Sequence, residues 1–205
     1  MSGEERSDAR RLEDLWSGKF GDAYTARNIA SGDGRRPFWD RVFADFPSAS
    51  ALEVGCNVGA NLRWVAERVS AVGLDVNHAA LAELQQRVPR ARPVQASARA
   101  LPFPDAAFDL VFTVGVLIHQ SPTTIDSVMR EIVRCARRYI LCAEYFSADL
   151  VEVPYRGQEG ALFKRDFGGL YKQLFTELAL KEQGFLGRAE GWDDVTYWMF
   201  EKKQG

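Results

Sequence analysis

The central part of the chain alternates short apolar runs with stretches of helical periodicity. The apolar runs predict five strands, at residues 51–55, 71–76, 92–96, 108–114 and 139–143. The periodic stretches predict helices at residues 59–69, 77–88 and 121–136, with Asn77 and Ser121 as N-caps. Strands and helices that alternate at this spacing imply right-handed crossovers and a parallel sheet covered on both faces. The fold class is therefore α/β and Rossmann-like.

The first 48 residues depart from this alternation. They contain two predicted helices, at 4–16 and 36–46, and the Gly-bearing sequence Ser31-Gly-Asp-Gly34 separates them. The first helix is polar with few apolar positions, which is typical of a helix that lies on another surface. We therefore divide the chain into a helical arm at 1–48 and a core at 49–205.

The last third of the chain is also irregular at first. Residues 145–166 form a long excursion, and Asp166 caps a further helix that runs to about residue 182. Two final apolar stretches, at 184–190 and 195–201, predict an antiparallel pair. This pair completes a mostly parallel seven-stranded sheet. Trp192, Trp198 and Phe200 are expected in the core around these strands.

Composition narrows the class of protein. The 205 residues are 46% hydrophobic and 26% charged, which is ordinary for one globular domain, and the net charge of −2 argues against nucleic-acid binding. The charged start, with no apolar segment after it, and the lack of an 18-residue apolar run predict a cytoplasmic protein without membrane contact. The three cysteines lack metal-binding spacing, and with only His78 and His119 available we expect neither structural zinc nor a His-rich metal centre. Composition leaves a carboxylate site for magnesium open, and we assign no metal ligand.

A glycine-bearing turn follows the first strand, at Glu53 to Gly59. Asp75 ends the second strand, where an acidic side chain meets both hydroxyls of a bound ribose. The two features together indicate a nucleoside ligand. A dinucleotide site requires a second glycine at the position where this chain has Asn57. Asn tolerates a positive φ, and its side-chain amide can bind a small polar group. S-adenosylmethionine, which has no phosphate, fits such a turn.

The chain resembles the class I S-adenosylmethionine-dependent methyltransferases over roughly residues 51–200. The resemblance is carried by Leu52-Glu-Val-Gly-Cys-Asn-Val-Gly59, Val72-Gly-Leu-Asp75, Leu101-Pro-Phe-Pro-Asp-Ala-Ala-Phe-Asp-Leu-Val111 and Gly115-Val-Leu-Ile-His119. More narrowly, it resembles the methylase family associated with pseudaminic acid biosynthesis. That likeness is carried by Leu15-Trp-Ser-Gly-Lys-Phe-Gly-Asp-Ala-Tyr-Thr-Ala-Arg-Asn28, Glu144-Tyr145, Val151-Glu-Val-Pro-Tyr-Arg-Gly157 and Leu162-Phe-Lys-Arg-Asp-Phe167.

The resemblance implies a role for each matching position. Gly55, Asn57 and Gly59 would wrap the methionine part, Asp75 the ribose, Ser97-Ala-Arg99 the adenine edge and Val114-Gly115 the sulfonium side. Many relatives carry an acidic residue for the adenine amine where this chain has Ser97. The full set of expected cofactor-binding residues is Phe20, Tyr24, Arg27, Glu53, Gly55, Asn57, Gly59, Asp75, Val76, Ser97, Ala98, Val114 and Gly115.

Acceptor binding is expected at the sheet edge beside the cofactor. His119 follows the fourth strand and is a candidate base, against the alternative of a packing or capping histidine, and Tyr24 is the second catalytic candidate. The excursion interleaves aromatic and basic residues, which suits an anionic group on the acceptor, unless these are merely solvated. The expected substrate-binding residues are His119, Tyr145, Tyr155, Arg156, Lys164 and Arg165.

The arm is expected to act as a lid over the cofactor. Trp16, Phe20, Tyr24 and Arg27 share one helical face, while Gly18 and Gly21 permit a bend. Tyr24 and Arg27 are candidates to meet the methionine carboxylate. The alternative is that the aromatic residues only pack the arm against the sheet's outer helices.

The sequence therefore predicts a methyltransferase (EC 2.1.1.-) that transfers a methyl group from S-adenosylmethionine to oxygen or nitrogen of a small polar metabolite, such as a sugar or a natural-product intermediate. A non-catalytic module that binds the cofactor and acts through a partner is the alternative, and an NAD-dependent enzyme ranks third because of Asn57. The expected partner is the small acceptor, and a homodimer is left open.

Overall fold

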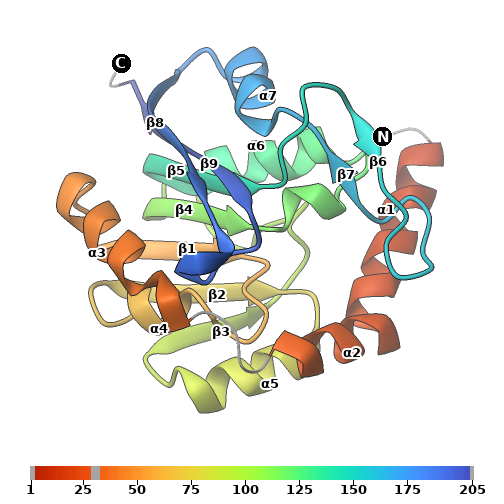
Figure 1. Cartoon of the computed structure of the whole chain (residues 1–205), viewed down its shortest axis with the longest axis horizontal. Coiled ribbons are helices and arrows are strands. Elements are labelled where there is room, and N and C mark those ends of the chain that lie inside the picture. Colours follow the sequence, from red (N-terminus) through yellow and green to blue (C-terminus); the bar gives the residue numbers. More distant parts are fainter. Residues whose placement is uncertain (1–2, 29–32, 204–205) are drawn as a thin grey trace.

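The computed structural model describes residues 3–28 and 33–203. Seven strands form one sheet in the order β3-β2-β1-β4-β5-β9-β8 (Figure 1). Their bounds are β1 Ser50–Val54, β2 Ser70–Asp75, β3 Ala91–Gln95, β4 Phe108–Val114, β5 Ala136–Glu144, β8 Leu178–Leu186 and β9 Val195–Lys202. Strands β1 to β5 pair in parallel, and β9 runs antiparallel to both of its neighbours, β5 and β8. The prediction of a mostly parallel seven-stranded sheet with an antiparallel C-terminal strand is confirmed.

Helices cover both faces of the sheet (Figure 1). They are α1 Gly3–Ser17, α2 Lys19–Asn28, α3 Arg36–Asp45, α4 Leu62–Val65, α5 His78–Arg87, α6 Ile125–Cys135 and α7 Phe167–Leu174, with single turns η1 Asp33–Arg35, η2 Leu117–His119 and η3 Arg188–Glu190. One core lies between the sheet and α6 and α7, and the other between the sheet and α3, α4 and α5. Alternate residues of each strand enter the two cores, because successive side chains of a strand point to opposite faces.

Two predicted helices are shorter than the sequence pattern indicates. The helix expected at 59–69 is only the four-residue α4, because the chain must turn back before Ser70, whose N–H donates to the Ala49 carbonyl oxygen at 3.1 Å. The expected N-cap Ser121 is wrong: α6 begins at Ile125. The Ser121 hydroxyl instead hydrogen-bonds the hydroxyls of Thr123 and Thr124. Asn77 is confirmed as an N-cap, since its Oδ1 accepts from the Ala80 N–H at 2.8 Å.

The first of the two C-terminal strands lies earlier than predicted, whereas the second, β9, begins at Val195 as expected. Asp166 caps α7 as expected, accepting from the Gly169 N–H at 2.8 Å, but α7 ends at Leu174 instead of about residue 182. The residues that follow form the long strand β8, which pairs with β9 from Leu178 to Leu186. The strand expected at 184–190 is therefore wrong in its bounds, because pairing with β9 determines where β8 lies. Within the excursion, Val151–Glu152 (β6) and Phe163–Lys164 (β7) form a two-stranded ladder.

The described part of the arm up to Asn28 consists of α1 and α2, which are separated at Gly18, where the sequence predicts a bend. Figure 1 shows α1 and α2 beside the core at the edge where strands of the sheet end. Residues 31 and 32 of the predicted Gly-bearing separator lie outside the described residues. Within the part of the chain that the structure describes, no helix has the length and apolar composition to cross a membrane.

Candidate active site

A cavity of about 570 Å³ opens at the carboxyl ends of the parallel strands, which is where open α/β sheets bind ligands. Loops from the core form its floor and the arm forms its roof. The volume is in the usual range for a small-molecule site. The predicted site residues that line it are Tyr24, Glu53, Gly55, Asn57, Asp75, Val76, Ser97, Ala98, Val114, Gly115, His119, Tyr145 and Tyr155.

The turn after β1 has the backbone conformation that the sequence predicts. Gly55 has φ of 72° and Asn57 has φ of 46°, so the prediction that Asn57 accepts a positive φ is confirmed. The turn is fixed from two sides. The Asn57 N–H donates to Oδ2 of Asp75 at 2.8 Å, and the Thr25 hydroxyl of the arm donates to Oδ1 of Asn57 at 3.1 Å. The arm is thus bonded directly to the turn.

Asp75 joins the turn after β1 to the start of α5. Its Oδ1 accepts from the Asn77 N–H at 2.9 Å, while Oδ2 is bonded to the turn at Asn57. Burial raises the pKa of Asp75, and the backbone N–H donors act in the opposite direction. Each carboxylate oxygen keeps a further lone pair. Asp75 can therefore accept two more hydrogen bonds from a ligand in the cavity.

A buried polar group lies beneath the other end of the turn. Glu53 is only 2% exposed, and its Oε1 accepts from Nδ2 of Asn61 at 2.6 Å. Its Oε2 is buried without a hydrogen-bond partner among the described residues. Burial raises the pKa of Glu53 to about 8, although the Asn61 hydrogen bond and the charge of Arg35 both lower it. An unsatisfied buried carboxylate oxygen at a cavity is a place for a cationic ligand group.

Arg35 completes this network, and the sequence analysis missed it together with Asn61. Nη1 of Arg35 donates to Oδ1 of Asn61 at 3.0 Å, and Nε donates to the Gly191 carbonyl oxygen at 2.8 Å. The guanidinium carbon lies 4.5 Å from the ring centroid of Trp192, which is buried as predicted but also lines the cavity. No local motif connects these residues, because they come from three distant segments.

The arm is bonded to several loops around the cavity. Nδ2 of Asn77 donates to the Trp16 carbonyl oxygen at 3.0 Å and to Oδ1 of Asp22 at 2.9 Å. Farther along α1, Nη2 of Arg11 donates to the Gly160 carbonyl oxygen at 2.8 Å. The arm therefore contacts both the loop after β2 and the excursion. The arm lines the cavity and also contacts the N-cap residue of the outer helix α5, and its role as a lid stays a prediction.

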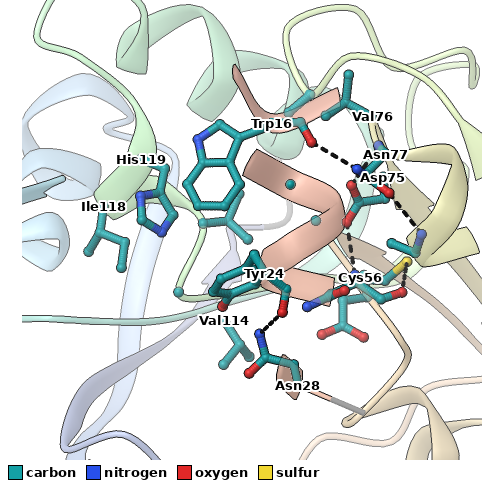
Figure 2. A pocket seen from close by; sticks show the side chains of 18 of the residues that line it. Trp16, Tyr24, Asn28, Cys56, Asp75, Val76, Asn77, Val114, Ile118 and His119 are labelled. Carbon is teal, nitrogen blue, oxygen red and sulfur yellow. Dashed lines mark hydrogen bonds between the residues drawn. The ribbon is translucent and has the colours of Figure 1, made fainter. Parts of the chain in front are cut away.

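Aromatic rings form the wall on the side of β4. Figure 2 shows the Trp16 indole between His119 and Tyr24. The Trp16 centroid lies 4.3 Å from that of His119 and 5.3 Å from that of Tyr24, and Tyr155 lies 5.3 Å from His119. These rings come from the arm, from η2 and from the excursion. Burial raises the pKa of Tyr24 above its usual range and that of Tyr145 to about 12, so both phenols are neutral at pH 7.

His119 is buried and neutral. Its Nδ1 lies 2.6 Å from the Ala161 carbonyl oxygen, which can only accept, so Nδ1 carries the proton and Nε2 is left as an acceptor. Burial lowers the pKa of His119 to about 4, outweighing the hydrogen bond to Ala161. A base with so low a pKa takes up a proton poorly at pH 7. His119 is better suited to accept a hydrogen bond that orients an acceptor group.

Six predicted residues do not line the cavity. The residues are Phe20, Arg27, Gly59, Arg156, Lys164 and Arg165. Phe20 packs on Trp16 and Tyr155, and a side chain at Gly59 would meet Leu84. The exposed Arg27 lies 5.8 Å from the Tyr24 ring centroid, and its role toward a methionine carboxylate stays a prediction.

The cations of the excursion also lie outside the wall. Arg156 is exposed, 5.9 Å from the Tyr155 ring centroid, and Lys164 lies 5.6 Å from that of Tyr145. Arg165 lines a separate hollow beside α7. These aromatic residues face the cavity while the basic ones beside them do not. The structure thus gives no support to an anionic subsite built from these three cations.

Residues 51–138 match the family model described as a methyltransferase domain, which covers β1 to the start of β5. An uncharacterized methyltransferase of Synechocystis sp. is 33% identical over 89 residues, which are 43% of this chain and 42% of that protein. The chain thus matches less than half the length of this curated relative.

Solved structures of methyltransferases share the whole fold. The 1,6-didemethyltoxoflavin-N1-methyltransferase of Burkholderia thailandensis, solved with S-adenosylhomocysteine, superposes with a TM-score of 0.71 at 16% identity, over 100% of this chain and 92% of that one. Magnesium protoporphyrin IX methyltransferase of Synechocystis PCC 6803 superposes with a TM-score of 0.72 at 14% identity, over 95% of this chain and 99% of that chain. Residues 51–138 are thus similar to a methyltransferase domain, and the solved structures share the fold of the chain. The narrower likeness to the pseudaminic acid-associated family stays a prediction.

Proposed function

We propose that the protein is an S-adenosylmethionine-dependent methyltransferase that acts on oxygen or nitrogen of a small polar acceptor, such as a sugar or a natural-product intermediate. The observation that carries the proposal is the placement of two carboxylates in one cavity. Asp75 has acceptor capacity for two ribose hydroxyls, and the unpartnered Oε2 of Glu53 suits the α-ammonium group. Arg35 is the cation for the methionine carboxylate.

When bound, S-adenosylmethionine supplies a methyl group already activated by its sulfonium charge. The chain therefore needs to align the acceptor and exclude water. Val114 and Gly115 at the end of β4 line the cavity between the cofactor residues and the aromatic wall. The arm closes this space from above through the contacts of Trp16, Thr25 and Asn77.

The acceptor end offers neutral hydrogen-bonding groups. Tyr145, Tyr155 and His119 line it, and Nε2 of His119 accepts a hydrogen bond from an acceptor O–H or N–H. A cavity of about 570 Å³ is of the size that small molecules occupy. A hydroxyl or amine on a compact, largely uncharged acceptor is the group that this wall binds without leaving a charge unpaired.

Calorimetric titration tests the cofactor assignment. We expect S-adenosylmethionine and S-adenosylhomocysteine to bind and NAD to give no heat of binding. Equal binding of NAD would contradict the proposal. Enzymatic activity is then followed by transfer of a labelled methyl group to a library of small hydroxyl and amine compounds. Tight cofactor binding without transfer to any compound would favour the alternative, a non-catalytic module that acts through a partner.

A further inference from the structure

The arm places a carboxylate beside the loop after β3. Ala9, Leu12, Glu13 and Trp16 all line the cavity, and their spacing of three and four residues puts them on one face of α1. Glu13 is the acidic residue among these four. Its side chain is bonded to Ser97 and forms an ion pair with Arg99, whose Nη2 lies 2.8 Å from Oε1. Glu13 thus connects the arm to the edge of the cavity that the residues after β3 form.

All described contacts of Glu13 go to the same oxygen. The Ser97 hydroxyl and both Nε and Nη2 of Arg99 meet Oε1. Oε2 is left without a partner among the described residues, and Glu13 is one of the residues that line the cavity. Because Arg99 pairs with the other oxygen, the side chain is held in one orientation. A fixed, half-used carboxylate is suited to accept a hydrogen bond from a ligand.

The sheet order indicates which part of the cofactor reaches this carboxylate. Glu53 and Arg35 lie by β1, Asp75 ends β2, and Ser97 follows β3, in the spatial order β1-β2-β3. With the amino-acid end at β1 and the ribose at β2, the base lies toward β3. Val76, Ala98 and Leu12 give that part of the cavity apolar surface for a flat ring.

We propose that Glu13 recognises the adenine of the cofactor, with Oε2 accepting a hydrogen bond from the exocyclic amine. The inference rests on the proposed function and adds a specificity-determining residue to it. Cofactor binding and closure of the arm are then coupled, because Glu13, the residue that binds the adenine base, belongs to the arm.

The test compares two ligands that differ at one position of the base, S-adenosylhomocysteine and S-inosylhomocysteine. The first has an amine at position 6 and the second a carbonyl oxygen. We expect the unmodified protein to prefer the adenosyl ligand by about tenfold or more, the usual value of a hydrogen bond to a charged group. In Glu13→Gln the amide can donate to the carbonyl oxygen, so the preference should shrink to near unity or reverse.

Two further variants separate recognition from mere stabilisation of the arm. Asp14→Asn is the matched control, because Asp14 is an exposed carboxylate on the same helix and does not line the cavity. Its preference should equal that of the unmodified protein. Ser97→Asp in the Glu13→Gln background should restore the preference for the adenosyl ligand by returning a carboxylate to this edge.

Each outcome of the titrations decides the inference. A Glu13→Gln protein that loses affinity for both ligands equally, with the ratio unchanged, would show that Glu13 only holds the arm, and would overturn the inference while leaving the proposed function intact. A reduced or reversed ratio supports it. Failure of the unmodified protein to bind S-adenosylhomocysteine would overturn the proposed function itself, and this inference with it.

Discussion

Cofactor binding is expected to release a proton from Glu53. In the free protein, burial raises the pKa of this carboxyl to about 8, so about nine in ten molecules carry the proton at pH 7. The α-ammonium group of the cofactor favours the ionised carboxylate, because an opposite charge at hydrogen-bond distance lowers the pKa. Binding at pH 7 should therefore release close to one proton, and the dissociation constant should fall as the pH rises toward 8.

The assay is calorimetric titration with S-adenosylhomocysteine at pH 7 in phosphate and in Tris. The observed enthalpy depends on the ionisation enthalpy of the buffer, and the slope gives the number of protons released. Glu53→Gln keeps an oxygen that can accept from Asn61 but cannot ionise. We expect proton release to vanish and the affinity to fall by about tenfold or more, as for a lost hydrogen bond to a charged group.

Glu67→Gln is the control, because Glu67 is an exposed carboxylate paired with Arg36, outside the cavity. It should match the unmodified protein in both affinity and proton release. The reasoning is refuted if Glu53→Gln binds the ligand as tightly as the unmodified protein with the same proton release. A loss of affinity in which the proton release persists would assign the proton to another group.

Three further outcomes are expected. Deleting residues 1–28 should abolish turnover and weaken cofactor binding in a protein that still folds by circular dichroism, and near-normal turnover would contradict the lid. Tyr155→Phe should raise KM for the acceptor without changing cofactor affinity, since Tyr155 lines the cavity near His119. Burial raises the pKa of Glu144 from 4.5 to about 7, so the folded state binds this proton more tightly than the unfolded state does. The free energy of unfolding should therefore fall as the pH rises from 4.5 to 7, by at most about 3 kcal/mol. Glu144→Gln should flatten that slope in denaturant titrations, and an unchanged slope would contradict the assignment.

The core of the fold is predictable from the sequence because its signals are local. The buried parallel strands are short apolar runs, and β4 has the predicted bounds, Phe108–Val114. The glycine-bearing turn and Asp75 were also placed correctly at the cavity, because each follows directly from a strand end. β8 was misplaced because its polar residues face solvent and its bounds depend on pairing with β9.

The residues that were missed come from distant segments. Glu13 contacts Ser97 across 84 positions and Arg35 contacts Asn61 across 26, and no sequence spacing marks such a pair. The cations of the excursion were misplaced for a related reason. Alternation along a loop shows that aromatic and basic residues are neighbours, but the turn at Arg156, with φ of 51°, helps determine which side faces the cavity.

The contacts of α1 also bear on how the protein matures. Arg11 is bonded to the Gly160 carbonyl oxygen, 149 positions away, and Asp8 to Thr123 across 115 positions. During synthesis, the arm leaves the ribosome before the excursion does, so part of its docking surface does not yet exist at that time. Loop closure over such distances is slow relative to formation of the helix itself. The contacts of the arm with the excursion therefore form only after the excursion has been made, and the cavity, which Leu12, Trp16 and Tyr155 line together, is complete only from that point on.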